Sequence, residues 1–134
     1  ADGGMMLNLQ ELQTILHHKL PIKIIIYENG GYLMMKHTQQ SGGMKRSHSD
    51  AASGVSLPDF RRLAHAWGFA AADLWTWKDF DTIIPTLFSS KEPAVVVYHM
   101  DPEQGLFPRL RPIDGRSPNF DEMSPLPSME QSHA

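Results

Sequence analysis

The stretch Ile22–Tyr32, "IKIIIYENGGY", joins a nearly continuous β-branched run to an acid, an amide and two glycines. The β-branched run predicts a strand that is buried on both faces, as strands of parallel sheets are. Glycine adopts backbone angles that other residues avoid, and it lets the backbone approach a ligand closely. A plain strand-to-helix connection needs a turn residue and an N-cap, but not the whole group Glu28–Gly31. The stretch therefore predicts a strand whose carboxyl end carries a functional turn.

Helical and strand periods alternate along the rest of the chain, and this order predicts the fold class. The expected elements are an amphipathic helix over 7–18, a helix from an N-cap at Ser56 to Gly68, a short strand over 71–74, a helix over 79–88 that Pro85 kinks or shortens, and a second buried strand over 93–99. Alternation of this kind predicts an α/β domain, with a parallel sheet and helices on both faces.

Two segments lie outside this pattern. Residues 39–54 are polar, rich in glycine and without either period, so we expect a mobile loop there. Six of the ten prolines occur from Pro102 onward, which divides the chain into a domain over 1–104 and a Pro-rich tail over 105–134. The opening "ADGG" is typical of a strand end, so we expect the chain to be a fragment that lacks the first strands of its sheet.

Composition limits the classes of protein to consider. The length of 134 residues suits a single core, and a net charge of −3 argues against a nucleic-acid partner, which would need a basic surface. No apolar run approaches the roughly 20 residues of a membrane span. The chain has no cysteine, so it has no thiolate metal site and no cysteine nucleophile, which fits a reducing, cytoplasmic location.

The candidate site follows from the predicted sheet. Ligands of parallel sheets bind beyond the carboxyl ends of the strands, where Asp2 and Asn29 are both expected to lie. Carboxylate, amide and backbone carbonyl oxygens suit Mg²⁺ or Ca²⁺, and a Mg²⁺ with few protein ligands is usually completed by substrate phosphates and water. The pattern therefore suggests a metal-bridged diphosphate. The alternative is that Asp2 and Asn29 are ordinary turn and cap residues, which are far more common than metal ligands.

These residues carry a resemblance to a known family. The "DGG" at Asp2 and the "ENGG" that contains Asn29 resemble the cofactor motif of thiamine-diphosphate-dependent enzymes. Within that superfamily the chain is similar to the acetolactate synthase branch, because four blocks occur in the same order: "NLQEL", "LPIKIIIYENGGY", "SLPDFRRLAHAWGF" and "VVVYHMDPEQGLFPRL". The resemblance implies the thiamine-diphosphate-binding fold, and it covers nearly the whole chain.

The resemblance also implies roles for individual residues. Asp2, Asn29 and the backbone carbonyl of Gly31 match the family's ligands to Mg²⁺. Gly3, Gly4, Gly30 and Gly31 would lie beside the diphosphate, and Met34 matches a methionine that contacts the thiazolium ring. No catalytic residue is expected in this chain, because the family's activating glutamate belongs to another domain.

By the same resemblance, the chain would be part of a carboligase or decarboxylase. Such an enzyme decarboxylates a 2-oxo acid such as pyruvate and either joins the product to a second carbonyl compound or protonates it. The other domains and a second subunit would complete each site, so the chain alone should be inactive. Some relatives also contain a flavin, so FAD is a possible cofactor of the intact enzyme.

Four residues depart from the family pattern: Ala1 replaces a glycine, Glu28 an asparagine, Leu33 a glycine and Thr38 a tryptophan. The last two leave the acceptor substrate open. Two other classes of function therefore stay in consideration: a non-catalytic relative that retains the fold, and an unrelated Mg²⁺-dependent nucleotide-binding module.

Overall fold

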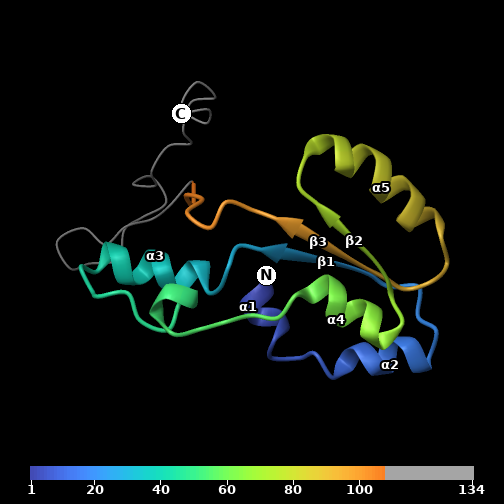
Figure 1. Ribbon diagram of the computed structural model, residues 1–134, viewed down its shortest axis with the longest axis horizontal. Helices are drawn as coiled ribbons and strands as arrows, with labels where there is room; N and C mark the ends of the chain where they lie inside the picture. The colour runs from blue at the N-terminus through green and yellow to red at the C-terminus, as the bar shows by residue number, and fades with distance from the viewer. Residues whose placement is uncertain (108–134) are drawn as a thin grey trace, which may run out of the picture. The chain divides into compact units, whose positions relative to one another are not determined.

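The computed structural model describes residues 1–107, and the remainder of the predicted Pro-rich tail lies outside the described residues. All of the helices and strands described below belong to one compact unit, Ala1–Glu103. In chain order they are α1 (Asp2–Met5), α2 (Glu11–His17), β1 (Lys23–Glu28), α3 (Leu33–Ser41), the 3₁₀ turn η1 (Ala51–Ser53), α4 (Phe60–Trp67), β2 (Ala70–Leu74), α5 (Trp77–Ser89) and β3 (Ala94–His99), as Figure 1 shows.

The three strands form a parallel sheet in the order β1-β3-β2. The central strand β3 aligns Val96 with Ile25 of β1 on one side and with Ala72 of β2 on the other. Its first four residues, 94–97, are all buried. A β-branched strand between two parallel neighbours has both faces covered, which is why its sequence is almost continuously apolar. The predicted parallel sheet is confirmed.

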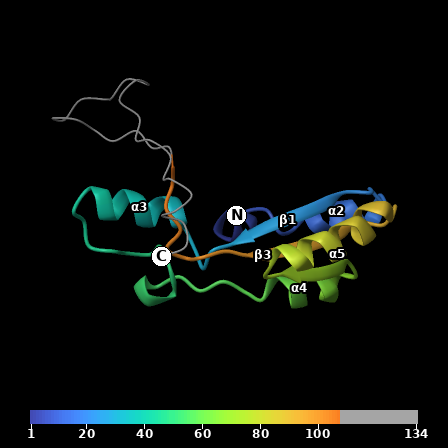
Figure 2. The ribbon, with the colours of Figure 1, turned by 90° about the horizontal axis from the view of Figure 1, so that it is seen from above.

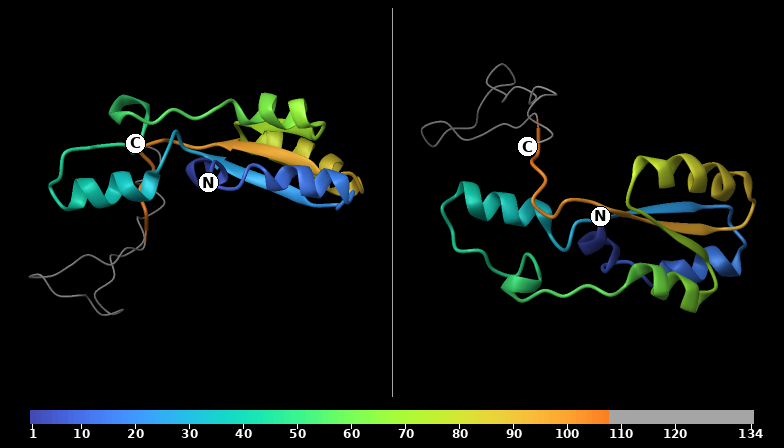
Figure 3. Two further views of the ribbon diagram at one scale, coloured as in Figure 1. Left: turned by 90° about the horizontal axis from the view of Figure 1, so that it is seen from below. Right: turned by 45° about the horizontal axis from the view of Figure 1, so that its top comes forward.

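Helices cover both faces of the sheet, as the alternating pattern predicts. Figure 1 and Figure 3 show α2 and α4 on one side of the strands and α5 on the other. The core lies on the side of α2 and α4 and consists of Leu12, Ile26, Phe60, Ala64, Phe69, Val95 and Val97. On the other face, Ile25 and Tyr27 of β1 are exposed, so the prediction that this strand is buried on both faces is wrong. The reason is that β1 lies at the edge of the described sheet and only Ile26 is buried in it.

Helix boundaries differ from the expected ones where a different residue supplies the cap. The N-cap of α4 is Asp59 and not Ser56, because the Asp59 carboxylate accepts a hydrogen bond from the Arg62 N–H at 2.9 Å. Gly68 ends this helix as predicted, in the left-handed region at φ 97°. Helix α2 begins at Glu11, after turns, rather than at residue 7.

Helix α5 is longer than predicted at both ends. A capping box between Thr76 and Asp79 starts it, and Pro85 lies within it without ending it before Ser89. The pKa of Asp79 lies below its ordinary value, first because the Thr76 hydroxyl donates to the carboxylate and then because the Trp75 N–H does. A capping carboxylate that stays ionised also suits the positive end of the helix dipole.

The segment 39–54, predicted as a loop without periodic structure, is partly ordered. Residues 39–41 are the end of α3, a helix that the sequence did not predict, and residues 51–53 form η1. Residues 2–5 form a helical turn rather than the end of a strand. Figure 2 shows α3 beyond the carboxyl ends of the strands, on the side where ligands of parallel sheets bind.

Two leucines of the N-terminal segment test where the core lies. Leu12 is 3% exposed and belongs to the core, whereas Leu7 is 76% exposed. We expect Leu12→Ala to lower the free energy of unfolding by about 2–5 kcal/mol, because it leaves a cavity. Leu7→Ala should change it by no more than about 0.5 kcal/mol. Urea denaturation of both variants measures the difference, and equal losses would contradict this assignment of the core.

Candidate metal and diphosphate site

The carboxylate of Asp2 is completely buried and holds the turn that follows β1. Its Oδ2 accepts hydrogen bonds from the backbone N–H groups of Asn29 and Gly31, both at 3.0 Å, and its Oδ1 accepts one from Gly3 at 2.7 Å. Hydrogen bonds to an ionised acceptor are stronger than neutral ones, and they offset the cost of burying the charge. Two segments far apart in sequence are therefore joined at one carboxylate.

The buried side-chain amide of Asn29 points into the same place. One of its two terminal atoms lies 3.2 Å from Asp2 Oδ1 and 3.0 Å from the carbonyl oxygen of Gly31. If the nitrogen occupies this position, it donates a hydrogen bond to each oxygen. If the oxygen turned toward this position, it would face two other oxygens, an arrangement that suits a bound cation. A half-turn of the amide converts one state into the other.

Only glycine fits at position 31. Its φ is +146°, and a Cβ there would lie 2.2 Å from the carbonyl oxygen of Ser49. Gly31 forms an isolated antiparallel bridge with Asp50, and the Tyr32 N–H donates to Ser49 O at 2.7 Å. The preceding Gly30 also has a positive φ, at 78°. The direction of the Gly31 carbonyl therefore depends on the segment around Ser49.

The other predicted cofactor residues differ in their surroundings. A Cβ on Gly3 would lie 2.7 Å from the Tyr32 ring, so this glycine leaves room for an aromatic side chain. A Cβ on Gly4 would meet nothing within 4 Å. Met34 lies in the first turn of α3 and is 65% exposed, so it is not part of the core.

A second polar cluster, which the sequence analysis missed, spans the carboxyl ends of the three strands. The two ring nitrogens of His99 contact carboxylate oxygens of Glu28 and Asp73, and Asp73 is also paired with Arg61 at 3.0 Å. The ring of Trp75 stacks on that of His99 with centroids 3.6 Å apart. The carboxylate of Glu28 is thus occupied by His99. The cluster had no local signal, because its members come from different strands and from α4.

Within residues 1–107 no group of three or more His, Cys, Asp or Glu side chains is arranged to hold a metal ion. The set around Asp2 is of another kind, because it combines one carboxylate with an amide and a backbone carbonyl group. The described residues also include no helix that is long and apolar enough to cross a membrane.

Comparison with known proteins places the chain in a family. Residues 1–98 match the model of the family described as "Thiamine pyrophosphate enzyme, C-terminal TPP binding domain". The chain belongs to this family, so the fold described above is that of a thiamine-diphosphate-binding domain.

Within the family the chain is similar to large subunits of acetolactate synthase. It is 32% identical over 113 residues to that of Cyanidium caldarium, which covers 84% of this chain and 19% of the relative. It is 26% identical over 124 residues to the isozyme 2 large subunit of Escherichia coli K12, which covers 92% of this chain and 22% of the relative. The chain thus spans about a fifth of the length of these relatives. These matches give no support to an unrelated nucleotide-binding module.

Two glycines of the site differ in what a methyl group would meet. Gly31→Ala should lower the free energy of unfolding by about 1–3 kcal/mol from the backbone angle alone, and the overlap with Ser49 O adds to this loss. Gly4→Ala adds a methyl group in open space within a helical turn and should stay within about 1 kcal/mol of the parent. Chemical denaturation compares the two variants. If Gly31→Ala is as stable as Gly4→Ala, the close approach to Ser49 is wrong.

Proposed function

We propose that this chain binds Mg²⁺ and the diphosphate of thiamine diphosphate in an enzyme that decarboxylates a 2-oxo acid such as pyruvate and ligates the product to a second carbonyl compound. The observation that carries the proposal is the convergence of the Asp2 carboxylate, the Asn29 amide and the Gly31 carbonyl. The similarity to acetolactate synthase large subunits supports the class of reaction.

The chemistry of these groups suits Mg²⁺, which binds few protein oxygens and is completed by phosphates and water. With its nitrogen toward them, the Asn29 amide donates to Asp2 Oδ1 at 3.2 Å and to Gly31 O at 3.0 Å, and a half-turn would bring its oxygen to the same place. One carboxylate, one amide and one carbonyl oxygen would leave three positions of the octahedron for phosphate oxygens and water.

The remaining residues suit a diphosphate and a ring beside this ion. By the family resemblance, Gly3, Gly4, Gly30 and Gly31 would lie beside the diphosphate. A Cβ would meet nothing within 4 Å at Gly4 and only Pro102 at Gly30, whereas at Gly3 and Gly31 it would meet Tyr32 and Ser49. The exposed Met34 has a flexible, polarisable thioether that could lie against the thiazolium ring. When bound, thiamine diphosphate supplies the capacity to stabilise a carbanion. The residues of this chain would bind and orient it.

The proposal assigns no proton-transfer role to this chain. The activating glutamate would come from another domain, and the other domains with a second subunit would complete the site, so the chain by itself should show no turnover. A flavin in the intact protein and a cytoplasmic location stay predictions.

The departure at Glu28 does not favour a non-catalytic relative. The Glu28 carboxylate contacts His99, whereas the oxygen set is formed by Asp2, Asn29 and Gly31. Replacing the family's asparagine by Glu28 therefore removes no oxygen from the set. Asn29, the next residue, still supplies the amide.

The experiment compares two asparagines in the intact protein that contains this chain. Asn29→Ala removes a proposed metal ligand without removing an acceptor from the backbone N–H groups of the turn. We expect its Mg²⁺-dependent affinity for thiamine diphosphate to fall by more than the roughly 10–100-fold that loss of an outer-shell partner causes. The exposed Asn8 serves as the matched control, and Asn8→Ala should bind as the parent does.

Isothermal titration with thiamine diphosphate, with Mg²⁺ and then with EDTA, measures both affinities. Release of CO₂ from pyruvate tests the reaction separately. Binding by the parent that does not need Mg²⁺, or unchanged binding by Asn29→Ala, would contradict the proposed metal site.

A further inference from the structure

Lys36 is the most unusual residue near the candidate site, because it is a lysine with an exposed fraction of only 3%. Lysine is almost never fully buried unless it is paired. Here Nζ donates to the carbonyl oxygen of Pro102 at 2.8 Å and to Glu103 Oε1 at 3.1 Å, and it lies 3.6 Å from Asp50 Oδ2. Two donors of the ammonium group make hydrogen bonds, and the carboxylates of Glu103 and Asp50 both pair with its charge.

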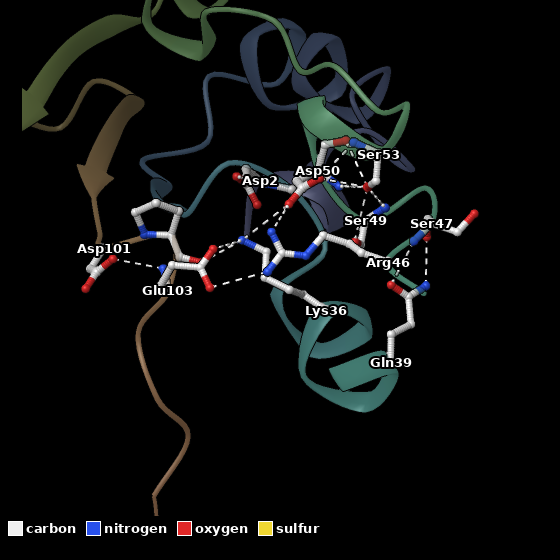
Figure 4. A network of polar contacts seen from close by, with 12 residues as sticks. Asp2, Lys36, Gln39, Arg46, Ser47, Ser49, Asp50, Ser53, Asp101 and Glu103 are labelled. Carbon is white, nitrogen blue, oxygen red and sulfur yellow. Dashed lines mark hydrogen bonds and ion pairs between the residues drawn. The ribbon is translucent and has the colours of Figure 1, made fainter. Parts of the chain in front are cut away.

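Arg46 closes these contacts into a ring. Its Nη1 lies 3.0 Å from Asp50 Oδ2, and its Nη2 lies 3.4 Å from Glu103 Oε2. Cations and anions therefore alternate around four ion pairs, Lys36–Asp50–Arg46–Glu103, which Figure 4 shows as one continuous network. This ion ring joins α3, the segment that leads into η1, and the segment that follows β3.

The electrostatic environment keeps both anions of the ion ring charged. The pKa of Asp50 is lowered, first by the hydrogen bond from the Ser53 hydroxyl and then by the charges of Arg46 and Lys36, although burial acts in the opposite direction. The pKa of Glu103 is lowered first by the hydrogen bond from Lys36. The ring therefore carries two positive and two negative charges at neutral pH.

Asp50 connects the ion ring to the candidate metal turn. Its Oδ1 accepts hydrogen bonds from the N–H and the hydroxyl of Ser53, and its Oδ2 faces Lys36 and Arg46, so both oxygens are committed. The backbone of Asp50 pairs with Gly31, and the preceding Ser49 accepts the hydrogen bond from Tyr32. A shift of Asp50 would therefore shift the backbone that holds the Gly31 carbonyl.

We propose that Lys36 is a positioning residue, which closes the ion ring and thereby holds Ser49 and Asp50 against the turn at Gly31. This inference rests on the proposed function, in which the Gly31 carbonyl is a ligand to Mg²⁺. Lys36 itself touches neither the ion nor the cofactor in this account. It acts through Asp50, and its loss would leave Asp50 and Glu103 facing each other with only Arg46 between them.

The first experiment measures Mg²⁺-dependent binding of thiamine diphosphate to the intact protein by calorimetry. Lys36→Met should weaken the affinity roughly 10–100-fold, as expected for loss of a residue that orients a ligand from outside the coordination shell. Lys36→Arg keeps the charge and should restore part of the affinity. Lys45→Met removes an exposed lysine from the neighbouring segment and should bind as the parent does.

A second control separates positioning from general instability. Leu12→Ala destabilises the core without touching the ion ring, so at a temperature where it stays folded it should keep the parent's affinity. Equal weakening in Leu12→Ala and Lys36→Met, or no weakening in Lys36→Met, would overturn the inference. If Lys36→Met does not fold, Glu103→Gln removes a neighbouring member of the ring whose side chain is 57% exposed. It should also weaken the affinity, and unchanged binding by Glu103→Gln would overturn the inference.

Hydrogen exchange without cofactor distinguishes failure of this inference from failure of the proposed function. The Tyr32 amide, which donates to Ser49 O, should exchange faster in Lys36→Met than in Lys45→Met. If the parent does not bind thiamine diphosphate but this difference is found, the proposed function fails while the link from the ion ring to the turn stands. Equal exchange in both variants overturns the link.

Discussion

The structure of this site depends on the hydrogen bonds that the buried carboxylate of Asp2 accepts from the backbone of Asn29 and Gly31. Without that acceptor, two N–H groups of a buried turn would lose their partner, and the turn after β1 would have no fixed position. Without the N–H groups, a completely buried carboxylate would be strongly unfavourable. The carboxylate and the two N–H groups therefore offset each other's cost of burial. Together they hold a compact group of oxygens at the edge of a parallel sheet.

Further contacts fix the position of the residues on either side of this turn. Gly31 is held by Asp2 on one side and by the backbone of Asp50 on the other. Asp50 is in turn held by Ser53 and by the proposed ion ring with Lys36. The side chain of Glu28, the last residue of β1, joins the His99 cluster and not the oxygen set. The turn therefore follows one polar network in sequence and is connected to another through Asp50, which suits a site that must keep its geometry when a cation binds.

Much of the fold could be predicted from the sequence because its signals are local and strong. The β-branched runs of β1 and β3 and the glycine that ends α4 have direct physical causes. The approach of Asp2 to Asn29 was also expected, but for a reason that is wrong, because Asp2 lies in the helical turn α1 and not at the end of a strand. Helix α3 was missed because it has no continuous apolar stripe, although its residues are good helix formers.

The other features that the sequence did not predict, the N-cap of α4 and the ion ring, depend on tertiary contacts. Ser56 and Asp59 are both good caps, and nothing local selects Asp59. The ion ring could not be predicted, since Lys36 and Glu103 are 67 positions apart and meet only in the folded chain. Arg46 and Asp50, spaced four residues apart, were the only local hint of it.

The most direct test of the account is a crystal structure of the intact protein with thiamine diphosphate and Mn²⁺ in place of Mg²⁺, with anomalous scattering used to locate the metal. The account predicts one anomalous peak at coordination distance, about 2–2.3 Å, from Asp2 Oδ1, Asn29 Oδ1 and Gly31 O together. A peak elsewhere, or a peak that only one of the three oxygens reaches, would contradict it.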